Sequence, residues 1–121
     1  MTDSHSDSLE QLRSQLAAFA RQRDWEGFHS PKNLAMALIA EAAELVEHFQ
    51  WLSEDESRRL SADKLAEVRL ELADILIYLI RTADQLDVDL IAAASGSTGS
   101  IRFKSANIIS FIVLSRFFGD W

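Results

Sequence analysis

The chain has 121 residues, a length that suits a single domain with one hydrophobic core. It has no Cys, which excludes disulfides and thiolate metal ligands, and its formal net charge of −7 disfavours binding to DNA or RNA. With 48% hydrophobic residues, few turn-forming residues and no apolar run long enough to span a membrane, the sequence predicts an all-α, globular, cytoplasmic protein with no membrane segment.

The first half of the chain predicts two helices separated by a loop. Apolar side chains recur at helical spacing after Ser8, which predicts a helix over residues 8–23. Residues 24–30 predict a loop. A capping Ser followed by Pro at positions 30–31 is typical of a helix start. We expect this second helix to end within residues 49–52.

Capping signals also place the next two helices. Ser53 with Glu56 three residues later has the form of a capping box, which predicts a short helix ending near Leu60. Ser61 is the expected cap of a long helix over about residues 62–86.

The last part of the chain differs in composition from the rest. Asp87 or Asp89 is the expected cap of a further helix that starts at Leu90. A stretch rich in Ser and Gly and an apolar tail then follow. We therefore divide the chain into a helical catalytic domain, 1–94, and a divergent linker and tail, 95–121.

Four carboxylates interrupt helices that are otherwise almost wholly apolar. In residues 34–46 and again in residues 70–80, two acidic side chains stand among Leu, Ala, Ile and Val. The spacing i, i+3 puts the members of each pair on one face of a helix. The two pairs are Glu41 with Glu44, and Glu71 with Asp74.

The chemistry of these acids favours a metal site. A helix that is apolar nearly all round is usually buried, and a buried carboxylate needs a counter-charge. A ligand set made only of carboxylate oxygens is the set that Mg²⁺ or Mn²⁺ prefers. The alternative is that each pair lies on a narrow solvent-facing stripe.

The two acidic pairs, Glu41-x-x-Glu44 and Glu71-x-x-Asp74, resemble the metal motif of MazG-like nucleoside triphosphate pyrophosphohydrolases. These enzymes belong to the all-α NTP pyrophosphatase superfamily. The resemblance extends over about residues 8–93 and is closest to the dCTP pyrophosphatase subgroup. It rests on the block Arg23-Asp24-Trp25-Glu26-x-Phe28-His29-x-Pro31-x-Asn33-Leu34, on Phe49-Gln50-Trp51 and on Asp74-Ile75-Leu76-Ile77-Tyr78-Leu79.

The resemblance implies a MazG-like helical bundle completed by dimerisation, as a homodimer or a homotetramer built as a dimer of dimers. It implies Mg²⁺-dependent hydrolysis of a nucleoside triphosphate, dCTP or a modified dCTP, to the monophosphate and pyrophosphate, which cleans the nucleotide pool. The implied catalytic and metal-ligating residues are Glu41, Glu44, Glu71 and Asp74. The implied substrate-binding residues are Trp25, His29, Asn33, Trp51 and Tyr78.

Each of the substrate-binding residues has a structural alternative. Trp51 and Tyr78 are also typical of core or helix-end positions, His29 of a helix cap, and Asn33 of a hydrogen-bonded residue near a helix start. Glu47 and His48 are interpreted as surface residues outside the metal set.

The chain departs from the family pattern at two places. A further Glu that often precedes the first motif acid is Ala40 here, as in the dCTP subgroup. Ser97 and Ile101 stand where that subgroup has Lys and Asn, and Arg102 and Lys104 are candidate substitutes. The alternative function is therefore a catalytically weak or inactive helical dimer that binds a nucleotide or a protein partner.

Overall fold

The described part of the chain is all-α, as the sequence predicts. The computed structural model describes residues 8–96, and this range contains helices and turns but no strand. The elements are α1 (Ser8–Gln22), the 3₁₀ turn η1 (Glu26–Phe28), α2 (Pro31–Glu47), α3 (Glu54–Ser57), α4 (Ala62–Gln85) and α5 (Leu90–Ser95).

Predicted caps start four of these helices. At each, a side-chain oxygen accepts a hydrogen bond from the backbone N–H three residues later, which satisfies one free donor of the first turn. The capping box is complete, because the Ser53 N–H also donates to Oε1 of Glu56 at 2.8 Å. The four caps are Ser30, Ser53, Ser61 and Asp89.

Two helices end earlier than expected. α2 ends at Glu47 rather than within residues 49–52, because the N–H of His48 donates to the carbonyls of both Leu45 and Val46. Such bonds to the third residue back tighten the last turn and end the regular helix. α3 ends at Ser57 rather than near residue 60. The N–H of Arg58 likewise donates to two carbonyls, those of Asp55 and Glu56.

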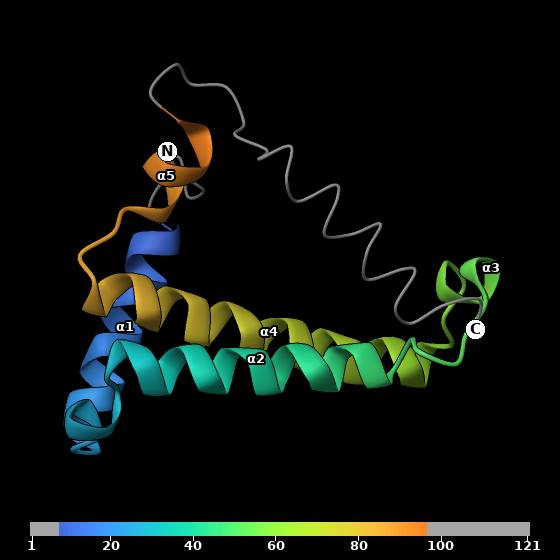
Figure 1. The fold of residues 1–121 in the computed structure, drawn as a ribbon, viewed down its shortest axis with the longest axis horizontal. Helices are drawn as coiled ribbons and strands as arrows, with labels where there is room; N and C mark the ends of the chain where they lie inside the picture. Colours follow the sequence, from blue (N-terminus) through green and yellow to red (C-terminus); the bar gives the residue numbers. More distant parts are fainter. Residues whose placement is uncertain (1–7, 97–121) are drawn as a thin grey trace.

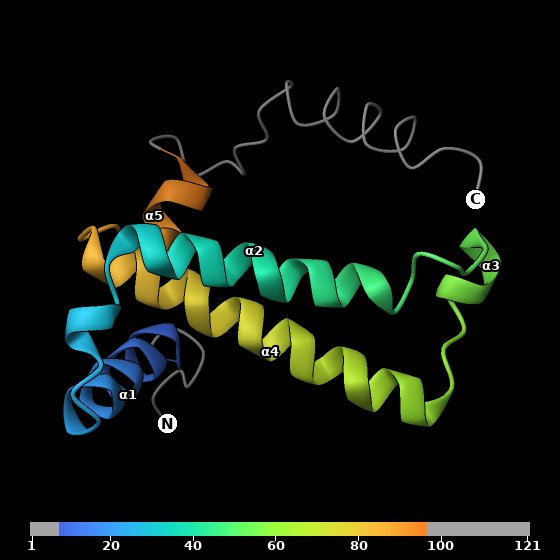
Figure 2. The same ribbon diagram turned by 60° about the horizontal axis from the view of Figure 1, so that its bottom comes forward.

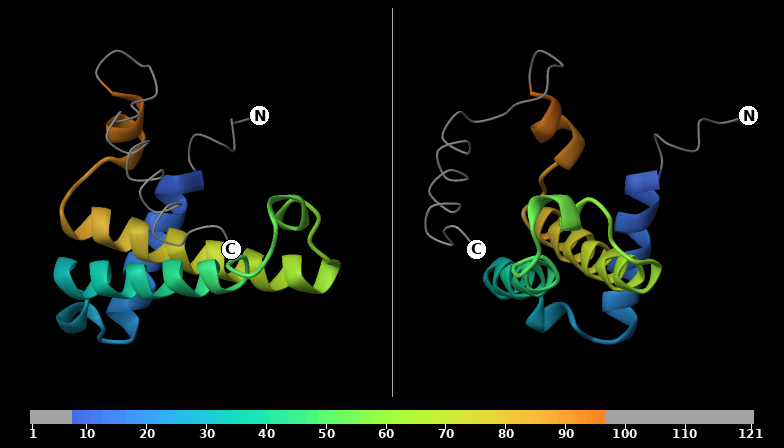
Figure 3. Two further views of the ribbon diagram at one scale, coloured as in Figure 1. Left: turned by 45° about the vertical axis from the view of Figure 1, so that its right-hand side comes forward. Right: turned by 90° about the vertical axis from the view of Figure 1, so that its right-hand side faces the viewer.

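α2 and α4 lie side by side and run antiparallel, with α3 in the connection between them (Figures 1 and 2). α1 crosses the C-terminal half of α4, on the other side of that helix from α2 (Figure 3). Most of the small core lies where these three helices meet. Its buried apolar side chains there are Ala20, Leu34, Ile80 and Ala83, and Val68 is buried in the N-terminal half of α4.

The expectation that both acid-bearing helices are buried nearly all round is wrong for the single protomer. Met36 and Ile39 of α2 are 60% and 67% exposed, and Leu70 of α4 is 68% exposed. α2 packs mainly against α4, and α1 crosses only one half of α4, so further apolar faces of both helices lie open to solvent.

Some sequence predictions concern the end of the chain. Helix α5 extends to Ser95, one residue past the proposed boundary between 1–94 and 95–121, and that division stays a proposal. The positions where the chain departs from the subgroup's Lys and Asn, and their candidate substitutes, lie outside the described residues, namely Ser97, Ile101, Arg102 and Lys104. Within residues 8–96, no helix combines the length and the apolar character that crossing a bilayer requires.

Candidate metal centre and nucleotide cavity

Acidic side chains meet between α2 and α4. Because these helices run antiparallel, acids spaced i, i+3 on their facing sides converge. Glu41, Glu44 and Glu71 each offer one carboxylate oxygen, and these oxygens lie within 4.8 Å of one another. We call these three residues the carboxylate cluster. Asp74 lies outside it, one turn along α4, and its charge still acts on Glu41.

The electrostatics of the cluster call for a cation. Burial raises the pKa of Glu41 above its ordinary value, and the negative charges of Glu44, Asp74 and Glu71 raise it further. Oε2 of Glu71 is buried and has no hydrogen-bond partner among the described residues. An unpaired buried carboxylate oxygen among other carboxylates is unfavourable unless a positive charge joins them. The oxygen-only cluster therefore fits a hard divalent cation.

The cluster is more accessible than the sequence analysis expected. Glu41 and Glu71 are half-buried, but Glu44 and Asp74 are exposed. The sequence left two interpretations of the acids, a buried metal site and a solvent-facing stripe, and each is true in part. The cluster lies in the contact between α2 and α4, and it opens to solvent on one side. A phosphorylated ligand can reach it there.

Replacing Glu41 by Gln should stabilise the protein when no divalent cation is present. A carboxyl group whose pKa is raised by folding favours the folded state below its ordinary pKa of 4.5, and this contribution is lost as the pH rises through the folded-state value. In EDTA, the Glu41→Gln variant should melt at a higher temperature than wild type near pH 7 and at a similar temperature near pH 4. Thermal unfolding followed by circular dichroism measures both. A lower melting temperature of Glu41→Gln than of wild type at pH 7 would contradict the inferred repulsion between Glu41 and the neighbouring carboxylates.

His48 belongs to the acidic site rather than to the surface, so that part of the sequence interpretation was wrong. Its Nε2 lies 3.6 Å from Oε1 of Glu71, and its side chain is 17% exposed. Its Nδ1 lies 3.3 Å from Nζ of Lys64 and 3.6 Å from Oε2 of Glu67, so both ring nitrogens face charged side chains of α4. The signal in the sequence was its spacing, because His48 follows Glu44 by four residues and shares its helix face.

A second feature is an apolar cavity of about 390 Å³ between α1, α4 and the loop after α1. It holds three of the five residues predicted to bind the nucleoside, Trp25, His29 and Tyr78. The Trp25 ring contacts Phe19 edge to face, with the ring centroids 5.5 Å apart. A cavity with aromatic walls and a few polar groups suits a planar base. We call it the aromatic cavity.

The other two predicted nucleoside residues do not line the aromatic cavity. Asn33 Nδ2 donates to the carbonyl of Phe28 at 3.1 Å, so this side chain ties the loop to the start of α2. Trp51 follows the opposite end of α2 and is 72% exposed. Within one protomer, the structure therefore brings three of the five residues together.

Arg81 is a cavity residue that the sequence analysis missed. It lies on α4, lines the aromatic cavity and is only 3% exposed. Its Nη1 donates to Oδ2 of Asp84 at 3.1 Å, and its Nε donates to Nδ1 of His29 at 3.4 Å. The available signal was its position directly after the apolar run of α4, three residues from Tyr78.

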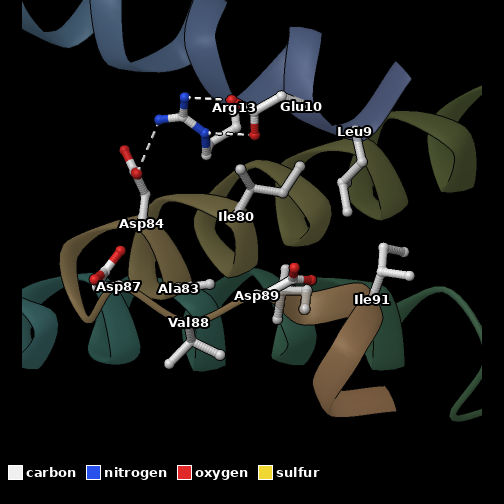
Figure 4. Close-up of a pocket in the computed structure, with 11 residues that line it drawn as sticks. Leu9, Glu10, Arg13, Ile80, Ala83, Asp84, Asp87, Val88, Asp89 and Ile91 are labelled. Atoms are coloured by element: carbon white, nitrogen blue, oxygen red, sulfur yellow. Dashed lines mark hydrogen bonds and ion pairs between the residues drawn. The ribbon is translucent and has the colours of Figure 1, made fainter. Parts of the chain in front are cut away.

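Another cavity, of about 590 Å³, is a poor candidate for the nucleotide site (Figure 4). It lies between α1, the end of α4 and α5 and contains none of the predicted site residues. Its one basic group, Arg13, is paired with Glu10 and Asp84. The remaining charged lining groups, Asp87 and Asp89, would repel a triphosphate.

Comparisons with known proteins agree with this geometry, although no protein-family model matches the chain. The chain is 45% identical over 89 residues to "dCTP pyrophosphatase 1" of Bos taurus, covering 72% of this chain and 53% of that protein. The Homo sapiens protein of the same name is also 45% identical, over 85 residues, covering 69% and 50%. The chain thus spans about half the length of the curated relatives it matches.

A solved structure covers nearly the whole chain. The crystal structure of a pyrophosphatase from Archaeoglobus fulgidus superposes with a TM-score of 0.66 at 32% identity, covering 93% of this chain and 94% of that one. The chain therefore belongs to the MazG-like pyrophosphatases, an all-α family.

Proposed function

We propose that this chain hydrolyses a nucleoside triphosphate, dCTP or a modified dCTP, to the monophosphate and pyrophosphate. The observation that carries the proposal is the placement of two half-sites along α4. Asp74 beside the carboxylate cluster and Tyr78 of the aromatic cavity are four residues apart, a rise of about 6 Å. A base in the cavity would thus leave its phosphates within reach of the acids.

Removing damaged nucleotides from the pool is the role that suits this activity, with the cytoplasm as its location.

The acids supply the metal half of the proposed mechanism. Glu41, Glu44 and Glu71 would hold Mg²⁺, or Mn²⁺ in its place, with Asp74 completing the set. The bound cation would supply positive charge to the phosphate oxygens. A carboxylate of this group takes the proton of the water that attacks the α-phosphorus, and the pyrophosphate leaves.

The cavity supplies the binding half. Trp25 and Tyr78 offer ring faces for a pyrimidine, and His29 offers an N–H to its edge. Their apolar neighbours from α1 exclude water from the base.

The test is to incubate the purified protein with each dNTP and Mg²⁺ and to follow the products by phosphorus NMR. We expect monophosphate and pyrophosphate, with dCTP converted fastest. Release of orthophosphate, or no turnover of any triphosphate, would refute the hydrolase. Calorimetry with a non-hydrolysable dCTP analogue would then decide whether the chain binds nucleotide without turnover.

We further infer that a second copy of the chain covers the open faces of α2 and α4. Exposed apolar residues recur there at intervals of seven, the spacing of paired helices. They are Ile39 and Val46 on α2, and Leu65, Leu72 and Leu79 on α4. Burying these two rows against a copy would complete a helical bundle, as a homodimer or a dimer of dimers.

Adding charge to these rows should separate the copies. Wild type should sediment as a dimer or tetramer, and the double variant Ile39→Lys, Leu72→Lys as a monomer, because a Lys facing its copy is desolvated and repelled. Ile91→Lys is the matched control, since Ile91 is 62% exposed and lies on α5, outside both rows. Sedimentation velocity at micromolar concentration gives the result. A monomeric wild type would exclude the assembly.

A further inference from the structure

We propose that Arg81 is a positioning residue that holds the His29 imidazole with Nδ1 as acceptor, so that His29 presents its Nε2–H to an acceptor atom on the edge of a pyrimidine. The proposal rests on the proposed nucleotide site and assigns to that site the residue that sets its hydrogen-bond polarity.

The first step is the burial of Arg81. Its side chain is 4% exposed, and a guanidinium so enclosed needs hydrogen-bond acceptors. Asp84 supplies one through Oδ2 at 3.1 Å, and its other oxygen, Oδ1, accepts from Arg13 of α1 at 3.0 Å. Figure 4 shows the contact between Arg13 and Asp84. Arg81 is therefore fixed by a carboxylate that is itself held by a second helix.

The second step is the contact with His29. Nε of Arg81 donates to Nδ1 of His29 at 3.4 Å, across 52 positions of sequence. An arginine has no acceptor and stays protonated, so this contact requires an unprotonated Nδ1. In a neutral imidazole the proton then resides on Nε2. Burial and the positive charge of Arg81 both lower the pKa of His29, which keeps the ring neutral at physiological pH.

The third step is what the cavity then offers a base. His29 lines the aromatic cavity, where its ring contacts the Trp25 ring with the centroids 6.0 Å apart, and the described residues show no side-chain hydrogen-bond partner for its Nε2. A fixed Nε2–H pairs with an acceptor such as the ring nitrogen N3 or carbonyl O2 of cytosine. It cannot accept from the exocyclic amine. The opposite tautomer would invert this preference, so Arg81 acts on base recognition through His29.

The test compares wild type with Arg81→Met, which keeps the apolar stem and removes the donors. Asp84 retains Arg13 in this variant, so no buried carboxylate is left unpaired. Arg69→Met is the matched control, because Arg69 is an exposed arginine of the same helix. Long-range proton–nitrogen NMR of the imidazole reports the tautomer without substrate, and steady-state kinetics with dCTP reports binding.

We expect wild-type and Arg69→Met His29 to hold only the Nε2–H form, and Arg81→Met to show both forms. The KM for dCTP should rise by about 2- to 10-fold in Arg81→Met, the worth of one oriented hydrogen bond, with kcat little changed. An Nδ1–H or mixed population in wild type would overturn the proposal, as would an Arg81→Met variant with unchanged tautomer and KM.

The two proposals fail in different ways. If no triphosphate is turned over, the hydrolase is refuted while the tautomer measurement still decides the role of Arg81. If Arg81→Met does not fold, Arg81→Gln replaces it, because an amide N–H can still donate toward His29 and should preserve the Nε2–H form. A mixed population in a folded Arg81→Gln variant would count against a donor role at this position.

Discussion

Glu71→Gln is expected to lower the rate of pyrophosphate release by more than about 100-fold. Loss of a group that only supports a metal ligand typically lowers metal affinity or activity by about 10- to 100-fold, and loss of a ligand itself lowers it further. Glu71 is the member of the carboxylate cluster with a buried, unpartnered oxygen. An amide NH₂ group in place of that oxygen would point its hydrogens toward the cation and could not act as a ligand. Pyrophosphate release at saturating Mg²⁺ and dCTP measures the effect.

Glu47→Gln is the matched control for this experiment. Glu47 is an exposed acid at the end of α2, three residues past Glu44, and it is not part of the cluster. It should retain nearly full activity. If Glu71→Gln keeps more than a tenth of wild-type activity while folded, the cluster is not the catalytic metal site. Asp74→Asn then tests whether the acid outside the close group contributes as a ligand.

The second large effect concerns stability. Ile80→Ala should lower the free energy of unfolding by about 2–5 kcal/mol, the range found when a large buried aliphatic side chain is truncated. Ile80 is 2% exposed and lies in the small core where α1, α2 and α4 meet, so few other contacts can compensate for the cavity. Urea denaturation followed by circular dichroism, with an unchanged slope, gives the value.

Leu86→Ala provides the comparison for Ile80→Ala. Leu86 ends α4 and is 56% exposed, so its truncation should cost well under 1 kcal/mol. Equal losses in the two variants would show that burial in the protomer does not determine stability at these positions.

The helix starts could be predicted from sequence because their causes are local. Ser30, Ser53 and Ser61 each satisfy a free backbone N–H three residues later, and this chemistry depends on a few neighbouring residues. The shared face of Glu41 and Glu44 was predictable for a similar reason, since i, i+3 spacing fixes a helix face, whereas their meeting with Glu71 depends on the pairing of α2 with α4.

What sequence could not give depends on which helix covers which face. The apolar runs of α2 and α4 suggested complete burial, but within one protomer both helices keep exposed apolar side chains such as Ile39 and Leu70. His48 and Arg81 were missed because their partners lie on other elements: Glu71 and Lys64 for the first, His29 for the second. A contact between residues 52 positions apart leaves no periodic trace in the sequence.

The aromatic cavity takes one wall from α1 and another from α4, and the charge of Asp84 is shared between the same two helices through Arg13 and Arg81. A ligand that fills the cavity binds only while α1 is docked, so it must favour the docked state by mass action. Amide hydrogen exchange in α1 should therefore slow when the cavity is occupied. Exchange at α1 would then report nucleotide occupancy at a distance from the acids.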